Sequence, residues 1–344
     1  MLAAVLLVIV FGRDLLPTQA TVLEMWNRWD APHFLEIARS GYGPPTDPAR
    51  IVLFPLYPAL IAIGSTLVQP LVAAMAISLV ATVVAASGLY RLTVLDYGRP
   101  IGTSAVVALS VFPTAFALIA PYSEALFLAL AVWSLVAGRR GQWKWAGVLG
   151  MLAAATRLQG VVLFPALLFA WWLERRRTAR DLAWLLLVPV GLGVYLAINL
   201  LVFGDPLHFM HVQASVFRVT TIAPWDAVGR LLSGAVNGVR NEGWVTVYAA
   251  PLAAEIGLAV VVLWTARSWR RRPAEAVYGL LTLALVASLS WPISVPRYIL
   301  GVPAVFTGLA VFAHGVPGGV AALILSTILF TTFTTLFITG HWAF

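Results

Sequence analysis

One short segment, WNRWDAPHFLEIARSGYG at positions 26–43, gathers side chains capable of chemistry in a chain of which 10% is charged. Its charged and titratable members are Arg28, Asp30, His33, Glu36 and Arg39, and its aromatic residues include Trp26, Trp29 and Tyr42. A carboxylate at a membrane–water boundary can serve as a general base, and tryptophan and tyrosine are enriched at that boundary. Asp30 is therefore the first candidate for a catalytic carboxylate.

Local structure offers a second interpretation of Asp30. Aspartate is favoured as the N-cap of a helix, and Pro32 would suit the first turn of a helix over 32–39. Gly41 would then end that helix. The spacing of these residues does not decide between a catalytic and a capping carboxylate.

The other polar residues of the segment have mainly structural interpretations. Glu36 and Arg39 are three positions apart and could pair on a helix surface. His33 is more typical of a packing or surface residue than of a base. We keep His33 as a candidate substrate-positioning residue, without an argued role for it.

Three further charges stand alone in apolar sequence: Glu124 in FPTAFALIAPYSEALFLAL, Arg157 in AAATRLQGVVLFPAL and Arg297 in SWPISVPRYILGVP. An isolated acid next to lipid is costly and indicates function by default. Alternatively, Ser123 caps the next helix and Glu124 interacts with its dipole. Each arginine could extend its head group to the interface or bind a lipid phosphate with its planar guanidinium. Two such arginines on one side favour the phosphate interpretation.

Two histidines and one more acid are weaker candidates. His208 and His211 are three apart, with Asp205 near, and could form a metal pair. No third ligand or supporting shell is evident from the sequence, so an amphipathic loop helix is favoured over a metal site. Glu255 lies inside an apolar run without an obvious partner, and could be protonated or paired with another helix.

Several motifs of nucleotide and metal chemistry are missing from the chain. The sequence has no GxxxxGK[ST], no GxGxxG in a βαβ setting and no DxD. We therefore expect no cofactor, no metal and no nucleotide-bound donor. Any activated substrate is expected to arrive through the bilayer.

Composition defines the elements that must position these residues. The 344 residues are 61% hydrophobic, with a mean hydropathy of +0.91, which is typical of a polytopic all-α membrane protein in a single domain, 1–344. The net charge of +8 does not indicate nucleic-acid binding, because the basic residues cluster in short loops. The chain has no cysteine, so no disulfide or thiolate site is expected. Residues 1–11 lack the features of a signal peptide.

Basic loops predict the topology. Thirteen of the 22 Lys and Arg residues, against four acids, lie in 91–99, 138–144, 174–181 and 267–275, which are therefore expected inside. About 11 transmembrane helices follow, over 1–16, 71–90, 101–120, 125–137, 145–157, 160–173, 182–203, 244–266, 276–291, 298–313 and 319–340. Asp30, Glu124, Arg157 and Arg297 then share the outer side.

The first outer loop, 13–70, contains an apolar stretch that does not fit a span. If 53–69 crossed the bilayer, the basic loops would alternate between sides, so we predict an amphipathic or re-entrant helix there. A hairpin of two short helices is expected to carry Arg157 near its outer tip. A second large outer loop covers 204–243, and no inverted repeat of the kind found in many transporters is evident.

The motifs resemble those of a known family. RWDAPHFLEIARSGYG followed by FPLYPAL resembles the signature of the GPI mannosyltransferase II (PIG-V) family and its bacterial branch, and FPTAFALIAPYSEALFLAL resembles that family's P-Y-S-E segment. ATRLQG, GDPLHFMHVQ and the Arg-Tyr of PRYIL are similar to shorter pieces of it, although Leu-Gln after Arg157 departs from the pattern. The resemblance implies a GT-C-type glycosyltransferase that uses a polyprenyl-phosphate sugar.

The resemblance also implies roles for particular residues. It makes Asp30 the catalytic base of an inverting, metal-independent transfer of mannose from polyprenyl-phosphate-mannose, at the extracytoplasmic face of what we expect to be a bacterial plasma membrane. Arg157 and Arg297 would bind the donor phosphate. The expected substrate-positioning residues are Glu124, Trp29, Tyr42, His33 and Gln213.

Other functions stay open on the sequence alone. A transporter or flippase of a lipid-linked or small polar solute is the main alternative, although its site would be expected near the bilayer midplane. An inactive subunit of an assembly complex is another. Besides membrane lipids and the donor, the partner is an acceptor that the sequence does not identify, whether glycolipid, lipoglycan or protein, and the sugar could differ from mannose.

Overall fold

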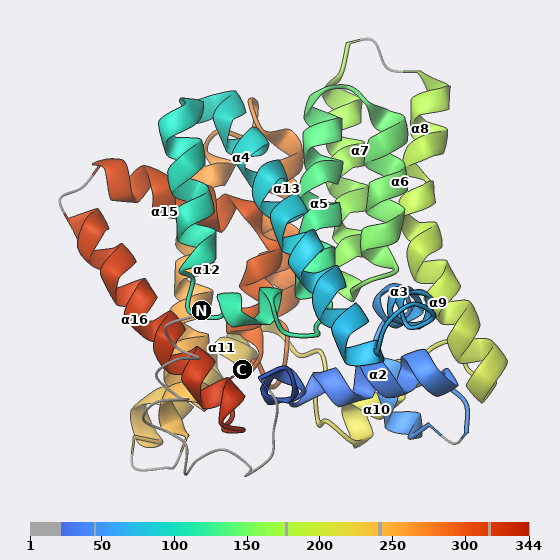
Figure 1. The fold of residues 1–344 in the computed structure, drawn as a ribbon. Helices are drawn as coiled ribbons and strands as arrows, with labels where there is room; N and C mark the ends of the chain where they lie inside the picture. The colour runs from blue at the N-terminus through green and yellow to red at the C-terminus, as the bar shows by residue number, and fades with distance from the viewer. Residues whose placement is uncertain (1–21, 45, 176–177, 240–242, 316–317, 344) are drawn as a thin grey trace.

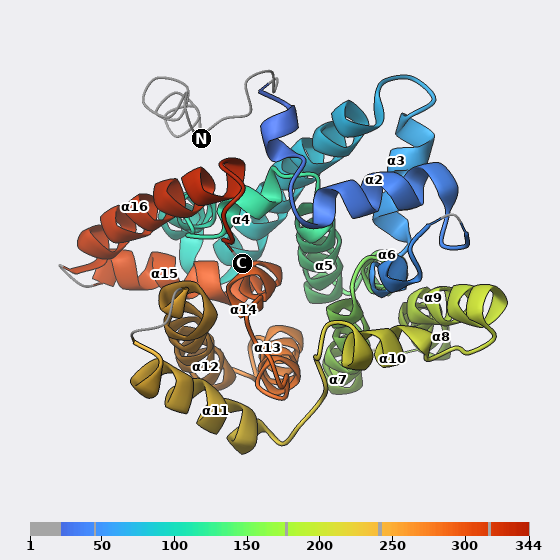
Figure 2. The same ribbon diagram turned by 90° about the horizontal axis from the view of Figure 1, so that it is seen from below.

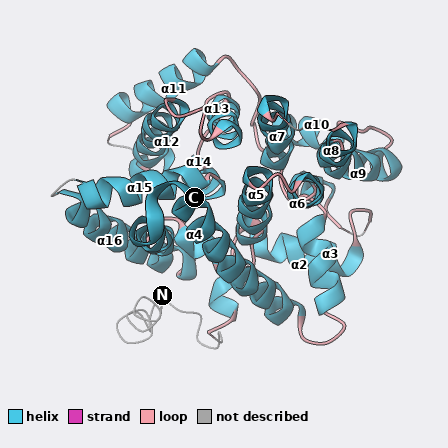
Figure 3. Cartoon of the chain, turned by 90° about the horizontal axis from the view of Figure 1, so that it is seen from above, coloured by secondary structure: helices cyan, strands magenta, loops and turns pink. Residues whose placement is uncertain are grey.

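The computed structural model describes residues 22–44, 46–175, 178–239, 243–315 and 318–343. Within these ranges the chain is helical apart from turns, loops and an isolated bridge between Thr221 and Leu289 (Figure 3). The first predicted span, 1–16, lies outside the described residues. The prediction of an all-α membrane protein is confirmed.

The helices follow one another along the whole described chain (Figure 1). They are α2 Asp30–Ser40, α3 Leu56–Gly64, α4 Pro70–Ser110, α5 Glu124–Arg139, α6 Trp143–Ala154, α7 Leu163–Leu173, α8 Ala179–Leu185, α9 Leu187–Phe203, α10 His208–Ser215, α11 Pro224–Asn237, α12 Ala250–Ala266, α13 Pro273–Val286, α14 Val295–Tyr298, α15 Pro303–Gly315 and α16 Gly318–Ile338. Shorter 3-10 turns cover Glu24–Trp26, Pro48–Val52, Ala115–Leu118, Leu158–Val162 and Ile299–Gly301, and a π turn covers Val245–Ala249.

Fewer helices reach the length of a membrane span than the sequence predicted. Among the described residues four are long and apolar enough: Pro70–Ser110, Ala179–Phe203, Val245–Ala266 and Gly318–Ile338. A fifth span is possible if Val295–Gly301 and Pro303–Gly315, bent by 88°, are counted together. Several predicted spans are instead short helices, such as the 12-residue α6. By length alone, the described residues therefore contain fewer full-length spanning helices than the predicted number of about 11, and the first predicted span, 1–16, is not among those residues.

Two predicted boundaries near α4 are wrong. The expected inside loop 91–99 is helical except for a break at Gly98, where φ is 80° and ψ is 175°. The expected span 101–120 ends at Ser110, because Pro113 disfavours helical geometry at the residue before it. The chain then forms the buried 3-10 turn Ala115–Leu118 before α5 begins.

The segment predicted as the first outer loop forms short elements, as expected. Helix α3 has nine residues, so 53–69 does not form a spanning helix, and the turn Pro48–Val52 precedes it. Helix α2 begins at Asp30, two residues earlier than expected, and ends at Ser40. Gly41 caps it, with a φ of 73° and a backbone N–H bond to the carbonyl of Ile37 that fit a helix terminus. Figure 2 views the molecule from the end that carries α2 and α10.

Two groups of charges mark opposite ends of α5. At its last turn, Arg139 contacts Asp96 at 2.9 Å and Glu275 at 2.7 Å, so three of the predicted inside loops meet there. At its first turn, Glu124 contacts arginines from later segments. Fifteen residues at 1.5 Å rise separate these groups by about 22 Å. This arrangement agrees with the predicted division between inner and outer loops.

Glycines bring α6 into close contact with its neighbours. A Cβ atom on Gly147 would lie 2.0 Å from the carbonyl oxygen of Trp184, and one on Gly160 would lie 2.3 Å from the backbone of Ala153. Small residues allow such close packing of apolar helices. Gly160 thereby holds the turn after α6 against that helix and sets the position of Arg157, at the tip of the predicted hairpin.

Candidate active site

Four charged side chains from distant parts of the chain form one network, which we call the charge cluster: Asp30, Glu124, Arg157 and Arg297. Arg297 Nη1 lies 2.8 Å from Asp30 Oδ2, and its Nε lies 3.0 Å from Glu124 Oε1. Arg157 Nη1 lies 2.8 Å from the same Glu124 oxygen. Asp30 and the three lone charges singled out from the sequence are therefore joined in space.

The start of α2 directs Asp30 into this network. The N-cap of α2 is Trp29, so the interpretation of Asp30 as the N-cap is wrong, and the capping residue makes no side-chain cap bond. Trp29 has φ 52°, a conformation that costs a non-glycine residue energy and is often retained at functional sites. The backbone turn at Trp29 allows the Asp30 carboxylate to meet Arg297.

Glu124 is the most buried member, with 4% of its side chain exposed. Ser123 makes no side-chain cap bond to α5; its hydroxyl accepts a hydrogen bond from Arg157 Nη1 at 3.2 Å. The predicted Ser123 cap is therefore absent. Glu124 lies in the first turn of its helix, where the dipole favours a carboxylate, and it also balances the charge of both arginines.

Two tyrosines that the sequence analysis did not single out complete the surroundings of the arginines. Arg297 lies 5.0 Å from the ring centre of Tyr122, and Arg157 lies 5.4 Å from that of Tyr298. The hydroxyl of Tyr122 donates to the carbonyl of Arg28 at 3.3 Å, linking the cluster to the residues before α2. The sequence offered one signal for them: Tyr122 lies two residues before Glu124, and Tyr298 directly follows Arg297.

Exposure rises across the cluster from Glu124 to Asp30. Arg297 is 9% exposed, Arg157 16% and Asp30 34%. The formal charges of the four groups sum to zero. Each guanidinium also contacts a carboxylate, which orients it. Asp30 is the member that a substrate from solvent or the interface reaches most readily. The arginines beside it supply donors suited to a phosphate.

Aromatic and polar groups lie beside Asp30. Trp29 meets Trp342, from the C-terminal end of the described chain, edge to face with ring centres 5.0 Å apart. The Trp342 indole nitrogen, Asn27 Oδ1 and Arg28 Nε are buried without a hydrogen-bond partner among the described residues. Buried polar atoms are normally paired, so these three atoms retain unused hydrogen-bonding capacity.

The other predicted positioning residues lie in different surroundings. The hydroxyl of Tyr42 donates to the carbonyl of Leu53 at 2.7 Å, and its ring packs with the apolar group around Tyr195, so its contacts are structural. Gln213 lies on α10, partly buried. The predicted Glu36–Arg39 pair is not found, because Glu36 forms an ion pair with Arg50 of the following turn.

His33, in the first turn of α2, lies near the charges of Asp47 and Arg50, which precede and belong to the turn Pro48–Val52. Burial, followed by the charge of Arg50, lowers the pKa of His33, and Asp30 opposes this with a smaller effect. Its Nδ1 atom is buried without a hydrogen-bond partner in the described structure. His33 is therefore held neutral near pH 7 and can donate or accept a hydrogen bond.

Metal-ligating groups occur away from the charge cluster. Asp205, His208 and His211, in the predicted second outer loop, bring potential ligand atoms within 4.8 Å of one another. Glu255 is buried within α12, and no ion pair to it is found among the described residues.

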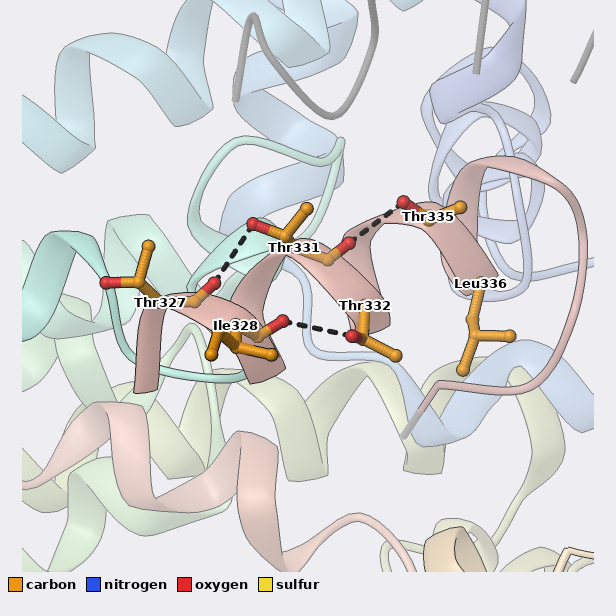
Figure 4. A pocket seen from close by; sticks show the side chains of 6 residues that line it. All are labelled: Thr327, Ile328, Thr331, Thr332, Thr335 and Leu336. Atoms are coloured by element: carbon orange, nitrogen blue, oxygen red, sulfur yellow. Dashed lines mark hydrogen bonds between the residues drawn. The ribbon is translucent and has the colours of Figure 1, made fainter. Parts of the chain in front are cut away.

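A separate hollow of about 480 Å³ lies along α16 (Figure 4). Its lining residues are Thr327, Ile328, Thr331, Thr332, Thr335 and Leu336. The hydroxyls of Thr331, Thr332 and Thr335 donate to backbone carbonyls four residues earlier, so they are already satisfied. The hollow shares no residue with the charge cluster and offers no titratable group.

Sequence comparison supports the resemblance inferred from the motifs. No model of a known protein family matches the chain. It is 32% identical over 154 residues to GPI alpha-1,6-mannosyltransferase 2 of Mus musculus, and 33% identical over 158 residues to that of Cricetulus griseus. These matches cover 41% and 42% of this chain and 31% of each relative. The chain is thus PIG-V-like in sequence over less than half its length.

Comparison of structures identifies the fold. The apo oligosaccharyltransferase of Archaeoglobus fulgidus matches with a TM-score of 0.51 at 13% identity, over 99% of this chain and 56% of that one. Apo ArnT from Cupriavidus metallidurans matches with a TM-score of 0.50 at 14% identity, over 98% of this chain and 75% of that one. The predicted GT-C-type fold is confirmed.

Proposed function

From this fold and this sequence likeness, we propose that the chain is a membrane glycosyltransferase that moves mannose from polyprenyl-phosphate-mannose to an acceptor hydroxyl. The observation that carries the proposal is the charge cluster, in which one accessible carboxylate lies beside two arginines. A hydroxyl acceptor needs a base, and a lipid-phosphate leaving group needs cations. The cluster contains both at one end of the helical bundle.

Asp30 is the proposed general base. The acceptor oxygen attacks the anomeric carbon from the face opposite the phosphate, and its proton passes to the Asp30 carboxylate. The bond between the anomeric carbon and the phosphate oxygen breaks, which releases polyprenyl phosphate and inverts the anomeric configuration. General-base assistance of this kind contributes about 10²–10⁴-fold to the rate.

The arginines are proposed to stabilise the leaving phosphate. The donor phosphodiester carries one negative charge, and the departing phosphate gains a second as the bond breaks. Arg157 and Arg297 would stabilise that growing negative charge. Both lie in a partly buried site, where electrostatic interactions are stronger than in water. Since phosphate is already a good leaving group, the scheme requires neither a general acid nor a metal.

Glu124 and the aromatic residues are proposed to prepare the site. Glu124 holds both guanidinium groups through one carboxylate oxygen, which orients them before the donor arrives. Trp29 and Trp342 present aromatic surfaces against which a sugar can lie, and the unpaired polar atoms nearby can bond its hydroxyls. His33 and Gln213 are kept as candidates for contacts with acceptor or sugar.

The proposed location of the reaction follows from the charge distribution. If the basic loops lie in the cytoplasm, the charge cluster lies at the extracytoplasmic end of α5. A lipid-linked donor could then enter from the outer leaflet. The acceptor is proposed only by chemical class, as a hydroxyl of a glycolipid, lipoglycan or protein.

A reconstituted assay tests the proposal. Purified protein is incubated with synthetic polyprenyl-phosphate-mannose and a membrane lipid extract, and the product is identified by mass. Asp30→Asn should lower turnover by about 10²–10⁴-fold while leaving the elution profile and thermal unfolding close to native. Asp226→Asn removes an exposed acid in the first turn of α11 and is the matched control, expected to keep native turnover.

Two results would overturn the assignment. Native turnover in the folded Asp30→Asn variant would exclude Asp30 as the base. Movement of the lipid-linked sugar across proteoliposome membranes without any transfer product would favour the alternative function of a transporter or flippase.

A further inference from the structure

We propose that Asp205, His208 and His211 form a binding site for a zinc ion in the second outer loop, separate from the charge cluster. The three residues lie where α9 ends and α10 begins, at positions i, i+3 and i+6. This inference concerns a different site from the proposed glycosyl transfer and does not depend on it.

The ligand atoms are already close together. One atom from each residue lies within 4.8 Å of the others, and Asp205 Oδ2 is 2.9 Å from His211 Nδ1. Zinc binds imidazole nitrogen and carboxylate oxygen at about 2.0–2.2 Å in tetrahedral geometry, which places two ligand atoms about 3.4 Å apart. Small side-chain rotations therefore suffice to reach the geometry of a bound ion.

Neighbouring groups orient two of the ligands. The other carboxylate oxygen of Asp205 accepts a hydrogen bond from the backbone N–H of Leu207 at 2.9 Å, which leaves Oδ2 directed toward His211. The ring of His208 stacks on Phe203 at 4.3 Å between centres and 15° between planes. Such supporting contacts are typical of metal ligands, whose orientation is set by their neighbours.

The backbone that carries these ligands is anchored. Gly204 ends α9 in the left-handed region at φ 74°, which turns the chain toward α10. Within α10, Phe209 is buried, and its backbone N–H donates to the fully buried Asn199 at 3.0 Å. The site is therefore built on a fixed turn, and a bound ion would tie the end of α9 to α10.

The ligand set favours zinc over magnesium or calcium. Two imidazoles and one carboxylate suit zinc and other late first-row metals, whereas magnesium and calcium prefer sites made of oxygen. Three protein ligands leave a fourth position for water or a further ligand. The competing interpretation is a simple His211–Asp205 ion pair on the surface, which needs no metal.

Metal binding to the full-length protein in detergent tests the proposal. The protein is purified without a polyhistidine tag, and Zn²⁺ is titrated by equilibrium dialysis with metal analysis. The chain has no cysteine, so no thiolate competes. Native protein should bind about one Zn²⁺, and His211→Ala should weaken binding by more than the roughly 10–100-fold that loss of a supporting contact costs. The side chain of His211 is 73% exposed, so the variant should fold.

A matched control separates this site from general histidine binding. His314→Ala removes a histidine of α15 that contacts Ser104 and should leave Zn²⁺ binding unchanged. Zn²⁺ should also raise the thermal midpoint of the native protein and not that of His211→Ala. Lack of Zn²⁺ binding by native protein, or native binding by His211→Ala, would overturn the proposal. Asp30→Asn should bind Zn²⁺ normally, which separates this test from that of the proposed function.

Discussion

Replacing Glu124 by glutamine should lower the free energy of unfolding by more than the loss of a single charge suggests. One oxygen of Glu124 contacts Arg157 at 2.8 Å and Arg297 at 3.0 Å, and 4% of the side chain is exposed. In Glu124→Gln, two arginines in a largely buried site would share one carboxylate, that of Asp30. The excess positive charge has little access to water.

The size of the effect follows from the burial of the group. Removing one partner of a buried ion pair costs about 3–5 kcal/mol, and a glutamine oxygen can still accept a neutral hydrogen bond, so we expect about 3 kcal/mol. For a chain of 344 residues, an unfolding entropy of about 2.1 cal/mol/K per residue converts this loss into a fall in thermal midpoint of roughly 4 °C. The value of kcat/KM for the lipid-linked donor should also fall, because the arginines lose their common anchor.

The assay compares two glutamates that both pair with arginine. Thermal unfolding in detergent is measured for Glu124→Gln and for Glu36→Gln, whose side chain is 36% exposed and contacts Arg50. An exposed ion pair contributes about 0–1 kcal/mol. The thermal midpoint of Glu36→Gln should therefore fall by a third or less of the fall expected for Glu124→Gln. Equal shifts in the two variants would refute the reasoning that burial and double pairing make Glu124 the anchor of the charge cluster.

Two further predictions concern the groups around Asp30. Arg297→Lys should lower kcat/KM for the donor by roughly 10–100-fold, the equivalent of one charge-assisted hydrogen bond, because one ammonium cannot contact both Asp30 and Glu124 as the guanidinium does; unchanged donor kinetics would contradict the phosphate assignment. For His33, burial and Arg50 lower the folded-state pKa below the ordinary 6.5, so the unfolded state binds more protons and stability should fall as pH drops below about 6.5. His33→Gln should flatten that pH dependence in thermal unfolding, and an unaltered pH dependence would exclude His33 as its source.

The candidate site residues could be recognised because charge is rare in this sequence. A lone acid or arginine in an apolar run is costly in lipid and must have a reason to be there, and that argument identified Glu124, Arg157 and Arg297. Asp30 was harder, since its helix start made a capping role equally plausible. The structure excludes that role by placing Trp29 at the cap and Arg297 against the carboxylate.

Pairing partners could not be predicted from spacing. Glu36 pairs with Arg50 and not with Arg39, because the turn at Pro48–Val52 folds back onto α2. Trp342 reaches Trp29 from more than 300 positions along the chain. Such contacts depend on how helices cross, which the sequence pattern does not specify.

The sequence by itself determined the class of the protein and the short elements between residues 22 and 69, since hydropathy and glycine or proline positions act locally. The tertiary structure decided which charges meet: it joined Asp30, Glu124, Arg157 and Arg297 in one cluster and left Tyr42 in an apolar group of its own. The physical reason is that a buried charge is stable only beside a partner. Close helix packing at glycines, as at Gly160, decides which partner comes within reach.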